Sequence, residues 1–311
     1  MGDKGNIVIV GSGIAAMSLS ATLKLANVNH VLLEKSSHCG GILGEIHNEL
    51  DDFVVGIFEN GKEIEKAVAD FNKKYNLPIQ FNSEVTDIDT ISKTISYLNS
   101  GELHTVKYNY AVIASGSRFK ILEEFKNAKL KNEIYYRISP FLTDFRQTAV
   151  AVIGSGDNAT IAALRLIEYA KKVYLINRSN KWTSRKDLVK EVKRHPEIEV
   201  IMNSSLKEIV GDETINKIVV FNNQEGRSSE IKIDKLVLKL GYLPNSNFMK
   251  NGIELDSKGY VVVNEKYQTS NEYVYAIGDI VSGVYKRIAI AQGQGTSLGT
   301  YFLKELLPSI S

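Results

Sequence analysis

The sequence has little cysteine, little proline and no long apolar run. Its 311 residues include one cysteine, Cys39, and five prolines. A single cysteine excludes an internal disulfide, a CxxC dithiol and a cysteine-rich metal site, and we expect no metal. No stretch approaches the roughly 18 apolar residues of a membrane helix, and the first residues lack the basic and apolar regions of a signal peptide. We therefore expect a soluble, cytoplasmic protein with no membrane partner.

An excess of charge of one sign is also absent. The chain has 38 lysine and arginine residues against 36 aspartate and glutamate residues, a net charge of +2. This balance gives no electrostatic reason to expect nucleic acid as a partner. With 43% hydrophobic residues, the length fits about two globular domains.

Two segments of the sequence are alike. Residues 6–16 and 149–159 each contain a short apolar run, the pattern GSGxxA and the start of a helical stretch. A second apolar run follows each of them, at residues 30–34 and 173–177. Strand, glycine turn, helix and strand in this order are typical of a Rossmann-like dinucleotide-binding unit. The repeat therefore predicts an α/β protein with two such domains.

The small residues of the pattern have separate physical roles. Gly11 would make the tight turn after the strand, Gly13 would let a pyrophosphate approach the backbone, and Ala16 would let the helix pack on the sheet. The second copy repeats them as Gly154, Gly156 and Ala159. The N-terminus of the following helix offers free N–H groups to the phosphates.

The residue that ends the second apolar run differs between the copies. In the first copy it is Glu34, an acid that can accept hydrogen bonds from the ribose hydroxyls of an adenosine. In the second copy Asn177 and Arg178 stand there, with Lys181 and Arg185 nearby. A base at this place suits a 2′-phosphate and favours NADP over NAD. A solvated basic loop is the alternative interpretation.

Apolar periodicity predicts the other elements. Helices are expected at residues 14–26, 63–75, 157–169 and 288–306. Strands are expected at residues 78–85, 90–97, 102–108, 200–210, 215–222 and 230–240. A turn is expected at residues 99–101, where the sequence reads Asn-Ser-Gly.

With these motifs in order, the whole chain resembles the low-molecular-weight thioredoxin reductase family of flavoproteins. The motifs that carry the resemblance are Gly11–Ala16 with Glu34, Gly40-Gly41-Ile42, Ala114-Ser115-Gly116, Gly154–Ala159 with Arg178, Leu240–Asn245, and Gly278-Asp279. The resemblance implies an α/β fold with two Rossmann-like, three-layer ββα dinucleotide-binding domains. An FAD-binding domain would comprise residues 1–115 and 243–311, and an NAD(P)H-binding-like domain residues 116–242. It also implies a homodimer.

The resemblance further implies two sets of cofactor-binding residues and no catalytic side chain, because the flavin carries the chemistry. The FAD set is Gly11, Gly13, Ile14, Ala15, Ala16, Glu34, Lys35, Gly41, Ile42, Val85, Ala114, Ser115, Gly116, Gly278, Asp279, Arg287, Ile288 and Ala289. The NAD(P)H set is Gly154, Gly156, Asp157, Asn158, Ala159, Asn177, Arg178, Lys181 and Arg185. The cofactors would be FAD and NADPH or NADH.

One departure from the family decides the reaction. Thioredoxin reductases carry CxxC just before the second glycine motif, and residues 135–144 contain no cysteine here. The chain therefore cannot run that reaction, and its nearest functional relatives would be ferredoxin or flavodoxin–NADP reductases of the thioredoxin reductase type. We interpret Cys39 as a small packed residue before Gly40, with a single-cysteine redox role as the alternative. His38 and His47 lie on the loop beside the presumed flavin.

The leading hypothesis is an FAD-dependent oxidoreductase that passes electrons from NAD(P)H through FAD to a non-dithiol acceptor. The acceptor could be a ferredoxin, a flavodoxin, a quinone, free flavin or another small molecule. A second hypothesis is an FAD oxidase or dehydrogenase that acts on a small molecule without nicotinamide. A third is a non-catalytic, FAD-loaded sensor or interaction module.

Overall fold

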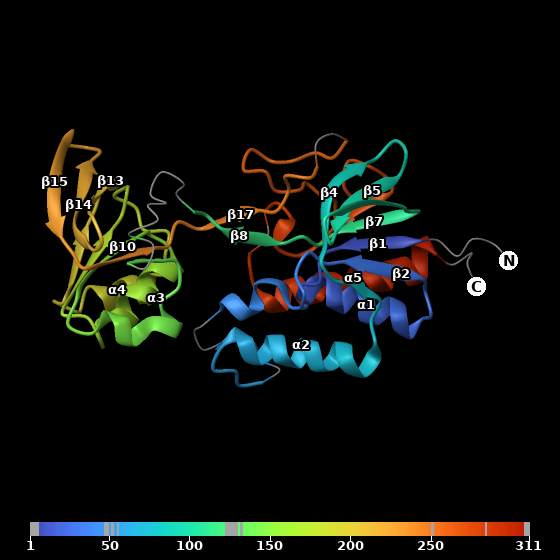
Figure 1. Cartoon of the computed structure of the whole chain (residues 1–311), viewed down its shortest axis with the longest axis horizontal. Coiled ribbons are helices and arrows are strands. Elements are labelled where there is room, and N and C mark those ends of the chain that lie inside the picture. Colours follow the sequence, from blue (N-terminus) through green and yellow to red (C-terminus); the bar gives the residue numbers. More distant parts are fainter. Residues whose placement is uncertain are drawn as a thin grey trace. The chain divides into compact units, whose positions relative to one another are not determined.

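The computed structural model describes residues 6–46, 50, 53–54, 56–121, 130, 133–249, 252–283 and 285–307. The chain divides into two compact units (Figure 1). Unit 1 comprises Met1–Arg118 and Leu243–Ser311, and unit 2 comprises Phe119–Tyr242. The chain thus leaves unit 1 after Arg118 and returns to it at Leu243. The domain boundaries expected from the sequence lie after residue 115 and before residue 243. Near both crossings the chain is extended, and β8 (Ser117–Phe119) pairs with β17 (Tyr242–Pro244).

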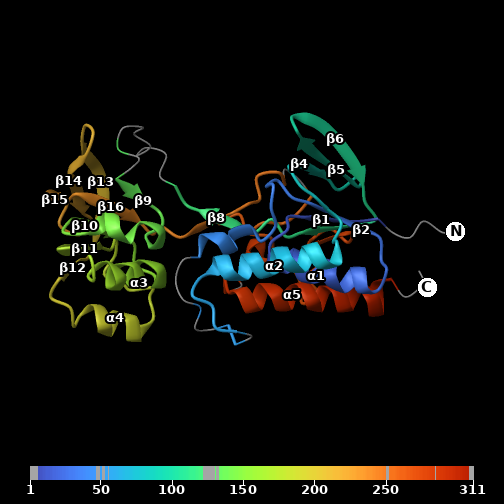
Figure 2. The ribbon, with the colours of Figure 1, turned by 60° about the horizontal axis from the view of Figure 1, so that its bottom comes forward.

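Unit 1 has three layers. Its central sheet is parallel, in the order β18-β7-β1-β2-β3. The strands are β1 (Ile7–Val10), β2 (His30–Leu33), β3 (Ile79–Gln80), β7 (Tyr110–Ile113) and β18 (Val274–Ala276). Three helices cover one face, α1 (Ile14–Leu25), α2 (Gly61–Tyr75) and α5 (Ile288–Tyr301) (Figure 2). An antiparallel sheet lies across the other face, made of β4 (Ser83–Asp89), β5 (Thr94–Asn99) and β6 (Glu102–Lys107).

The alternation of side chains along β1 builds both cores of unit 1. Ile7 and Ile9 pack in the helical layer, while Val8 and Val10 pack beneath the antiparallel sheet. All four are buried, which explains why this strand reads as a continuous apolar run. Short 3₁₀ or π turns complete the unit: η1 (Gly41–Glu45), η4 (Gly278–Ile280) and η5 (Phe302–Leu306).

Unit 2 repeats this plan in the order β12-β11-β10-β16-β9. Its parallel strands are β9 (Ile134–Tyr135), β10 (Ala149–Ile153), β11 (Lys172–Ile176), β12 (Ile198–Ile201) and β16 (Lys235–Leu238). Its antiparallel strands are β13 (Ser204–Gly211), β14 (Ile215–Asn222) and β15 (Arg227–Lys232). The helical elements are η3 (Ser139–Phe145), α3 (Asp157–Leu166) and α4 (Lys186–Val192). The expected α/β fold with two Rossmann-like domains is confirmed.

Two strands predicted as continuous are each broken by an asparagine. The run at 78–85 splits into β3 and β4 at Asn82, and the run at 200–210 splits into β12 and β13 at Asn203. Both asparagines are left-handed, with φ of 55° and 54°. The backbone N–H of Asn82 donates to Ser36 O at 3.1 Å, and that of Asn203 donates to Ser179 O at 3.2 Å. Both units therefore use the same turn between their two sheets. The predicted strand at 230–240 is also two strands, β15 and β16.

The last helix of unit 1 packs closely against the first at two of its glycines. A Cβ added at Gly295 would collide with the carbonyl of Ala15, and one at Gly299 would lie 2.8 Å from the Cβ of Thr22. Glycine at these two positions therefore allows the two helices to approach each other closely. In the described part of the chain, no helix is long and apolar enough to span a membrane.

Candidate functional site

The first glycine turn of unit 1 contains two glycines that are needed for different reasons. Gly11 has φ of +100°, and a Cβ there would lie 2.6 Å from Ala114 O, so only glycine fits between the strands. Gly13 has φ of −68°, which any residue adopts, and an added Cβ meets nothing within 4 Å. Neither the backbone nor the packing of the described residues requires glycine there. The open space at Gly13 fits a group that must approach the backbone closely, as a pyrophosphate does.

The start of α1 lies at this open space. Among the described side chains none caps the helix at Gly13, so the amides of its first turn face the turn without a side-chain acceptor. Ile14 is half-buried, while Ala15 and Ala16 are buried against the rest of unit 1. The helix thus presents backbone N–H groups, with a partial positive charge, rather than side chains.

A second glycine loop lies over Gly13. Gly40 N donates to Ser12 O at 2.9 Å, and a Cβ on Gly41 would lie 3.1 Å from Gly13 Cα. The loop continues into η1, where Ile42 is half-buried. Gly41 therefore lies at the turn, and Ile42 follows it along the chain.

Glu34 is buried at the end of β2 and bonded to the same turn. Its Oε2 accepts hydrogen bonds from the N–H and the hydroxyl of Ser12, both at 2.8 Å, and its Oε1 accepts one from Ser36 N at 2.8 Å. A carboxylate has about four acceptor sites, so three protein bonds orient it while leaving capacity for a hydroxyl. Lys35 is exposed. The two serines were missed, although Ser12 stands inside the GSG pattern.

The strand end at Ala114–Gly116 is tied to the returning chain. Ser115 Oγ donates to Asn245 O, and Asn245 Nδ2 donates to Ser115 O, each at 2.8 Å. Gly116 has φ of +66°, and a Cβ there would meet no atom within 4 Å. The reciprocal bonds between Ser115 and Asn245 fix a strand end that lies beside Gly11.

Val85, on β4, also belongs to the predicted FAD set. It is half-buried against the core beneath the antiparallel sheet.

The Gly278-Asp279 turn is joined to α5 and to β8. Gly278 N donates to Gln294 Oε1 at 2.6 Å, and Ser117 Oγ donates to Asp279 Oδ2 at 3.3 Å. Lys286 Nζ donates to Asp279 O at 2.7 Å. Burial raises the pKa of Asp279, while the Lys286 charge and the Ser117 bond oppose that rise.

The residues at the start of α5 also belong to the predicted FAD-binding set. Arg287 is its exposed N-cap residue, and the half-buried Ile288 and exposed Ala289 follow in its first turn. No side chain of the described residues caps this helix either. The starts of α1 and α5, Glu34, the strand end at Ala114 and the Gly278 turn thus belong to one unit.

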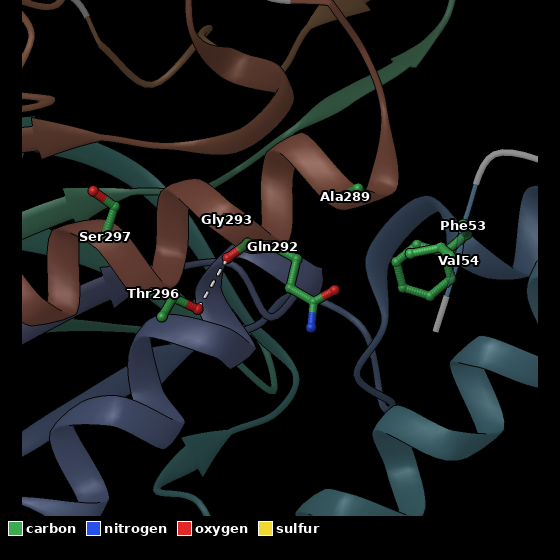
Figure 3. A pocket seen from close by; sticks show the side chains of 7 residues that line it. All are labelled: Phe53, Val54, Ala289, Gln292, Gly293, Thr296 and Ser297. Atoms are coloured by element: carbon green, nitrogen blue, oxygen red, sulfur yellow. Dashed lines mark hydrogen bonds between the residues drawn. The ribbon is translucent and has the colours of Figure 1, made fainter. Parts of the chain in front are cut away.

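A pocket opens beside the N-terminal half of α5 (Figure 3). It has a volume of about 560 Å³. Its lining is Phe53, Val54, Ala289, Gln292, Gly293, Thr296 and Ser297. Figure 3 shows Phe53 opposite the exposed face of the helix, with Gln292 between them. Apart from Ala289, the sequence patterns did not indicate these residues.

Cys39 is buried before the glycine loop. Burial raises the pKa of its thiol, and the charges of Glu34 and Glu65 raise it further. An inert, protonated thiol follows. His38 is exposed and lies 3.7 Å from Glu65 Oε1, whereas His47 lies outside the described residues. Within the described residues, no group of His, Cys, Asp and Glu is placed to hold a metal ion.

The glycine turn of unit 2 repeats the logic of unit 1. Gly154 has φ of +149°, and a Cβ there would lie 2.5 Å from Lys239 O. Gly156 has φ of −92°, and a Cβ there would meet only Thr183 Oγ1, at an ordinary 3.5 Å. Gly156 thus has a backbone that any residue adopts and space for a close approach at the start of α3. Ala159 is buried against Gly154.

The loop after β11 is pinned onto this turn. Asp157 Oδ1 accepts hydrogen bonds from Ser184 Oγ at 3.0 Å and from Arg185 N at 2.8 Å. The hydroxyls of Ser155 and Thr183 are 3.1 Å apart. These bonds hold the loop at the start of α3. Of the other predicted residues there, Asn158 is exposed, and its Nδ2 donates to the Tyr242 hydroxyl at 3.2 Å.

The residues predicted to bind the nucleotide after β11 are Asn177 and three basic residues, and their surroundings differ. Asn177 is buried and shapes the loop, accepting from Ser179 N at 3.2 Å and donating to Lys181 O at 3.0 Å. Arg185 Nη2 lies 3.1 Å from Asp187 Oδ2. Arg178 and Lys181 are exposed, and no carboxylate of the described residues pairs with Arg178. Arg178 and Lys181 are therefore both available as cations near this strand end.

Known proteins are similar to this chain over most of its length. The chain is 27% identical over 304 residues to a thioredoxin reductase of Borreliella burgdorferi, covering 93% of this chain and 88% of that protein. It is also 27% identical to a ferredoxin–NADP reductase of Picrophilus torridus, covering 98% and 96%. The crystal structure of T. acidophilum thioredoxin reductase superimposes with a TM-score of 0.82 at 28% identity, covering 98% of each chain.

The model of one protein family, pyridine nucleotide-disulphide oxidoreductase, matches residues 5–295. The thioredoxin reductase-like members of this family bind FAD and NADPH. The glycine turns with open space beside Gly13 and Gly156, and the uncapped helix starts behind them, fit two dinucleotides. The chain therefore belongs to the pyridine nucleotide-disulphide oxidoreductase family, as an FAD-dependent oxidoreductase with the thioredoxin reductase-like fold.

Proposed function

We propose that this enzyme passes electrons from NAD(P)H through FAD to an acceptor other than a protein dithiol. The observation that carries the proposal is the single, buried Cys39, whose raised pKa keeps the thiol protonated. A thioredoxin reductase reaction needs a dithiol, which a chain with one cysteine does not have. FAD, when bound, would accept a hydride from NAD(P)H and would pass the electrons on to the acceptor.

In this proposal, the protein binds and orients the FAD through unit 1. The amides at the start of α1 and the open face of Gly13 receive the pyrophosphate, and Glu34 accepts the ribose hydroxyls. Asp279 accepts from the ribityl chain, and the start of α5 stabilises negative charge on the flavin ring. The hydrogen bonds that Ser12, Gln294 and Lys286 form with these groups support this proposal because they hold the groups in place.

Unit 2 binds the nicotinamide dinucleotide. The start of α3 and Gly156 receive its pyrophosphate, and the exposed Arg178 pairs with a 2′-phosphate, which favours NADPH. The loop pinned by Asp157 presents Arg178 and Lys181 at the strand end. Their placement supports the assignment of unit 2 as the electron-donor side.

The acceptor belongs to one of two classes. The ferredoxin–NADP reductase of Picrophilus torridus, named for a protein acceptor, is a relative over almost the whole chain. The pocket beside α5 instead suits a small molecule that contacts Phe53 and the helix. The second candidate function, an FAD enzyme that oxidises a small molecule without nicotinamide, would use the same pocket for its substrate. The homodimer and the cytoplasmic location stay predictions.

Anaerobic mixing with NADPH or NADH tests the proposal. Rapid bleaching of the visible flavin absorbance band is expected, followed by recovery when ferredoxin, flavodoxin or a quinone is added. No bleaching by either nucleotide would contradict the proposal and favour the nicotinamide-independent function.

A further inference from the structure

A lysine lies at the crevice of unit 2, on the side away from Arg178. Lys239 directly follows β16, and its N–H donates to Ile153 O at 2.9 Å. Its carbonyl oxygen is the atom nearest to a Cβ added at Gly154. The chain runs from β10 to β11 on one side, while β16 lies on the other. In open α/β sheets, ligands bind at such a switch point, beyond the carboxyl ends of the strands.

The side chain of Lys239 extends along this edge of the sheet. Its Nζ donates to Tyr136 O at 2.7 Å, just after β9, the next parallel strand. The lysine is half-buried. Burial, with a smaller effect from the Arg137 charge, lowers its pKa to about 8. One carbonyl partner leaves two of its three N–H donors for another acceptor.

No carboxylate of the described residues forms an ion pair with Lys239. The nearest acidic group on the glycine turn, Asp157, instead accepts from Ser184 and Arg185. A desolvated cation without a counter-charge costs stability. An anion bound in the crevice would supply that counter-charge.

The corresponding residue of unit 1 shows that the fold does not require a lysine. Ala114 has the same backbone contacts, with its N–H donating to Val10 O at 2.9 Å and its carbonyl beside Gly11. Alanine therefore suffices to pack against a glycine turn of this kind. Apart from the bond to Tyr136 O, the long charged side chain is an addition that packing at the glycine turn does not require.

We propose that Lys239 binds the diphosphate of the nicotinamide dinucleotide, a group that NADPH and NADH share. The inference rests on the proposed binding of that dinucleotide by unit 2. Lys239 then contributes affinity for both nucleotides, whereas Arg178 contributes the preference for the 2′-phosphate. It acts as a binding residue and takes no part in the transfer of electrons.

Equilibrium binding to the oxidised, FAD-loaded protein tests this assignment without turnover. Dissociation constants for NADP⁺, NAD⁺ and ADP-ribose are measured by calorimetry for the parent, Lys239→Met, Lys239→Arg and Lys171→Met. Loss of a charge-assisted bond is expected to weaken all three ligands about tenfold or more in Lys239→Met, with partial recovery in Lys239→Arg. The exposed Lys171 directly precedes β11, at the amino ends of the parallel strands, whereas Lys239 follows β16 at their carboxyl ends. Lys171→Met is therefore the control for the change in charge and should show parent values.

Thermal unfolding of the nucleotide-free proteins separates binding from support. Lys239→Met should unfold at the parent temperature or higher, because the substitution removes a desolvated charge that has no carboxylate partner among the described residues. Parent affinities in Lys239→Met would overturn the inference, as would weaker binding with a clearly lower unfolding temperature. Normal ADP-ribose binding with weakened NADP⁺ would overturn the diphosphate as the contact. If the parent itself binds none of the three ligands, the proposed function fails first.

Discussion

Lys239 in unit 2 occupies the position that Ala114 occupies in unit 1. Each residue follows a parallel strand, and the carbonyl of each lies against the first glycine of the neighbouring turn, Gly154 or Gly11. The same backbone therefore carries a small residue in one dinucleotide crevice and a cation in the other.

The titration of Lys239 predicts a pH dependence of nucleotide binding. The lysine is charged below its pKa of about 8, and the neighbouring Arg137 stays charged throughout this range. The affinities for NADP⁺ and NAD⁺ should therefore both fall as pH rises through about 8. Calorimetry across this range checks the trend, and Lys239→Met should lose it. A parent profile as flat as that of the variant would contradict the prediction.

The same shift acts in the opposite direction on unfolding. In the unfolded chain the lysine keeps its proton up to its ordinary pKa of 10.5, whereas the folded protein releases it near 8. The unfolded state then binds more protons, so the free energy of unfolding should rise with pH between these values. The nucleotide-free parent and Lys239→Met, compared by urea denaturation, should differ most at the lower end of this range.

Gly13→Val should give colourless protein that still folds. The backbone at Gly13 accepts any residue, and a Cβ there meets no described atom within 4 Å. The side chain would instead fill the space proposed for the FAD pyrophosphate. Flavin content by absorbance and secondary structure by circular dichroism check both parts. A yellow variant with full FAD occupancy would refute the proposed position of the cofactor.

Asp279→Ala should weaken FAD binding. A hydrogen bond to a charged group is worth roughly 1.5–3 kcal/mol, so the affinity should fall about tenfold to a hundredfold. The FAD dissociation constant of the apoprotein, measured by the quenching of flavin fluorescence, tests this. Lys232→Ala, an exposed change in unit 2, serves as the control. A dissociation constant equal to that of the parent would remove Asp279 from the site.

Cys39→Ser should leave the reduction of the flavin by NAD(P)H unchanged. The thiol is buried, and its raised pKa keeps it protonated at neutral pH. Stopped-flow bleaching rates of parent and variant should agree, and the parent should react slowly with iodoacetamide. A charge-transfer band that the substitution abolishes would instead indicate a redox role for this cysteine.

Arg178→Ala should change the choice of nucleotide. Without the guanidinium, the Michaelis constant for NADPH should rise about tenfold or more, while that for NADH should barely change. Lys239→Met is the informative comparison, because it should affect both nucleotides alike. Equal losses for NADPH and NADH in Arg178→Ala would contradict the role in binding the 2′-phosphate.

The glycine turns and the fold class could be predicted because they depend on local sequence. Gly11 and Gly13 lie between an apolar strand and a helix, and that order alone indicates a Rossmann-like unit. Asn82 and Asn203 were missed as strand breaks, because their left-handed turns depend on which sheet the next strand joins. Lys239 reads as one more residue at the end of an apolar run. Its burial and its contact with Tyr136 exist only once β9 lies beside β16.

The division of unit 1 between two distant stretches of chain sets an order of folding during synthesis. Unit 2 is continuous, so it can fold as soon as residue 242 has left the ribosome. Unit 1 must wait, because β18 and α5 come from the returning stretch and cover β7 and α1. Until then the buried face of α1 stays exposed to solvent and to chaperones. A nascent chain stalled before residue 243 should therefore contain a folded unit 2 and bind no FAD.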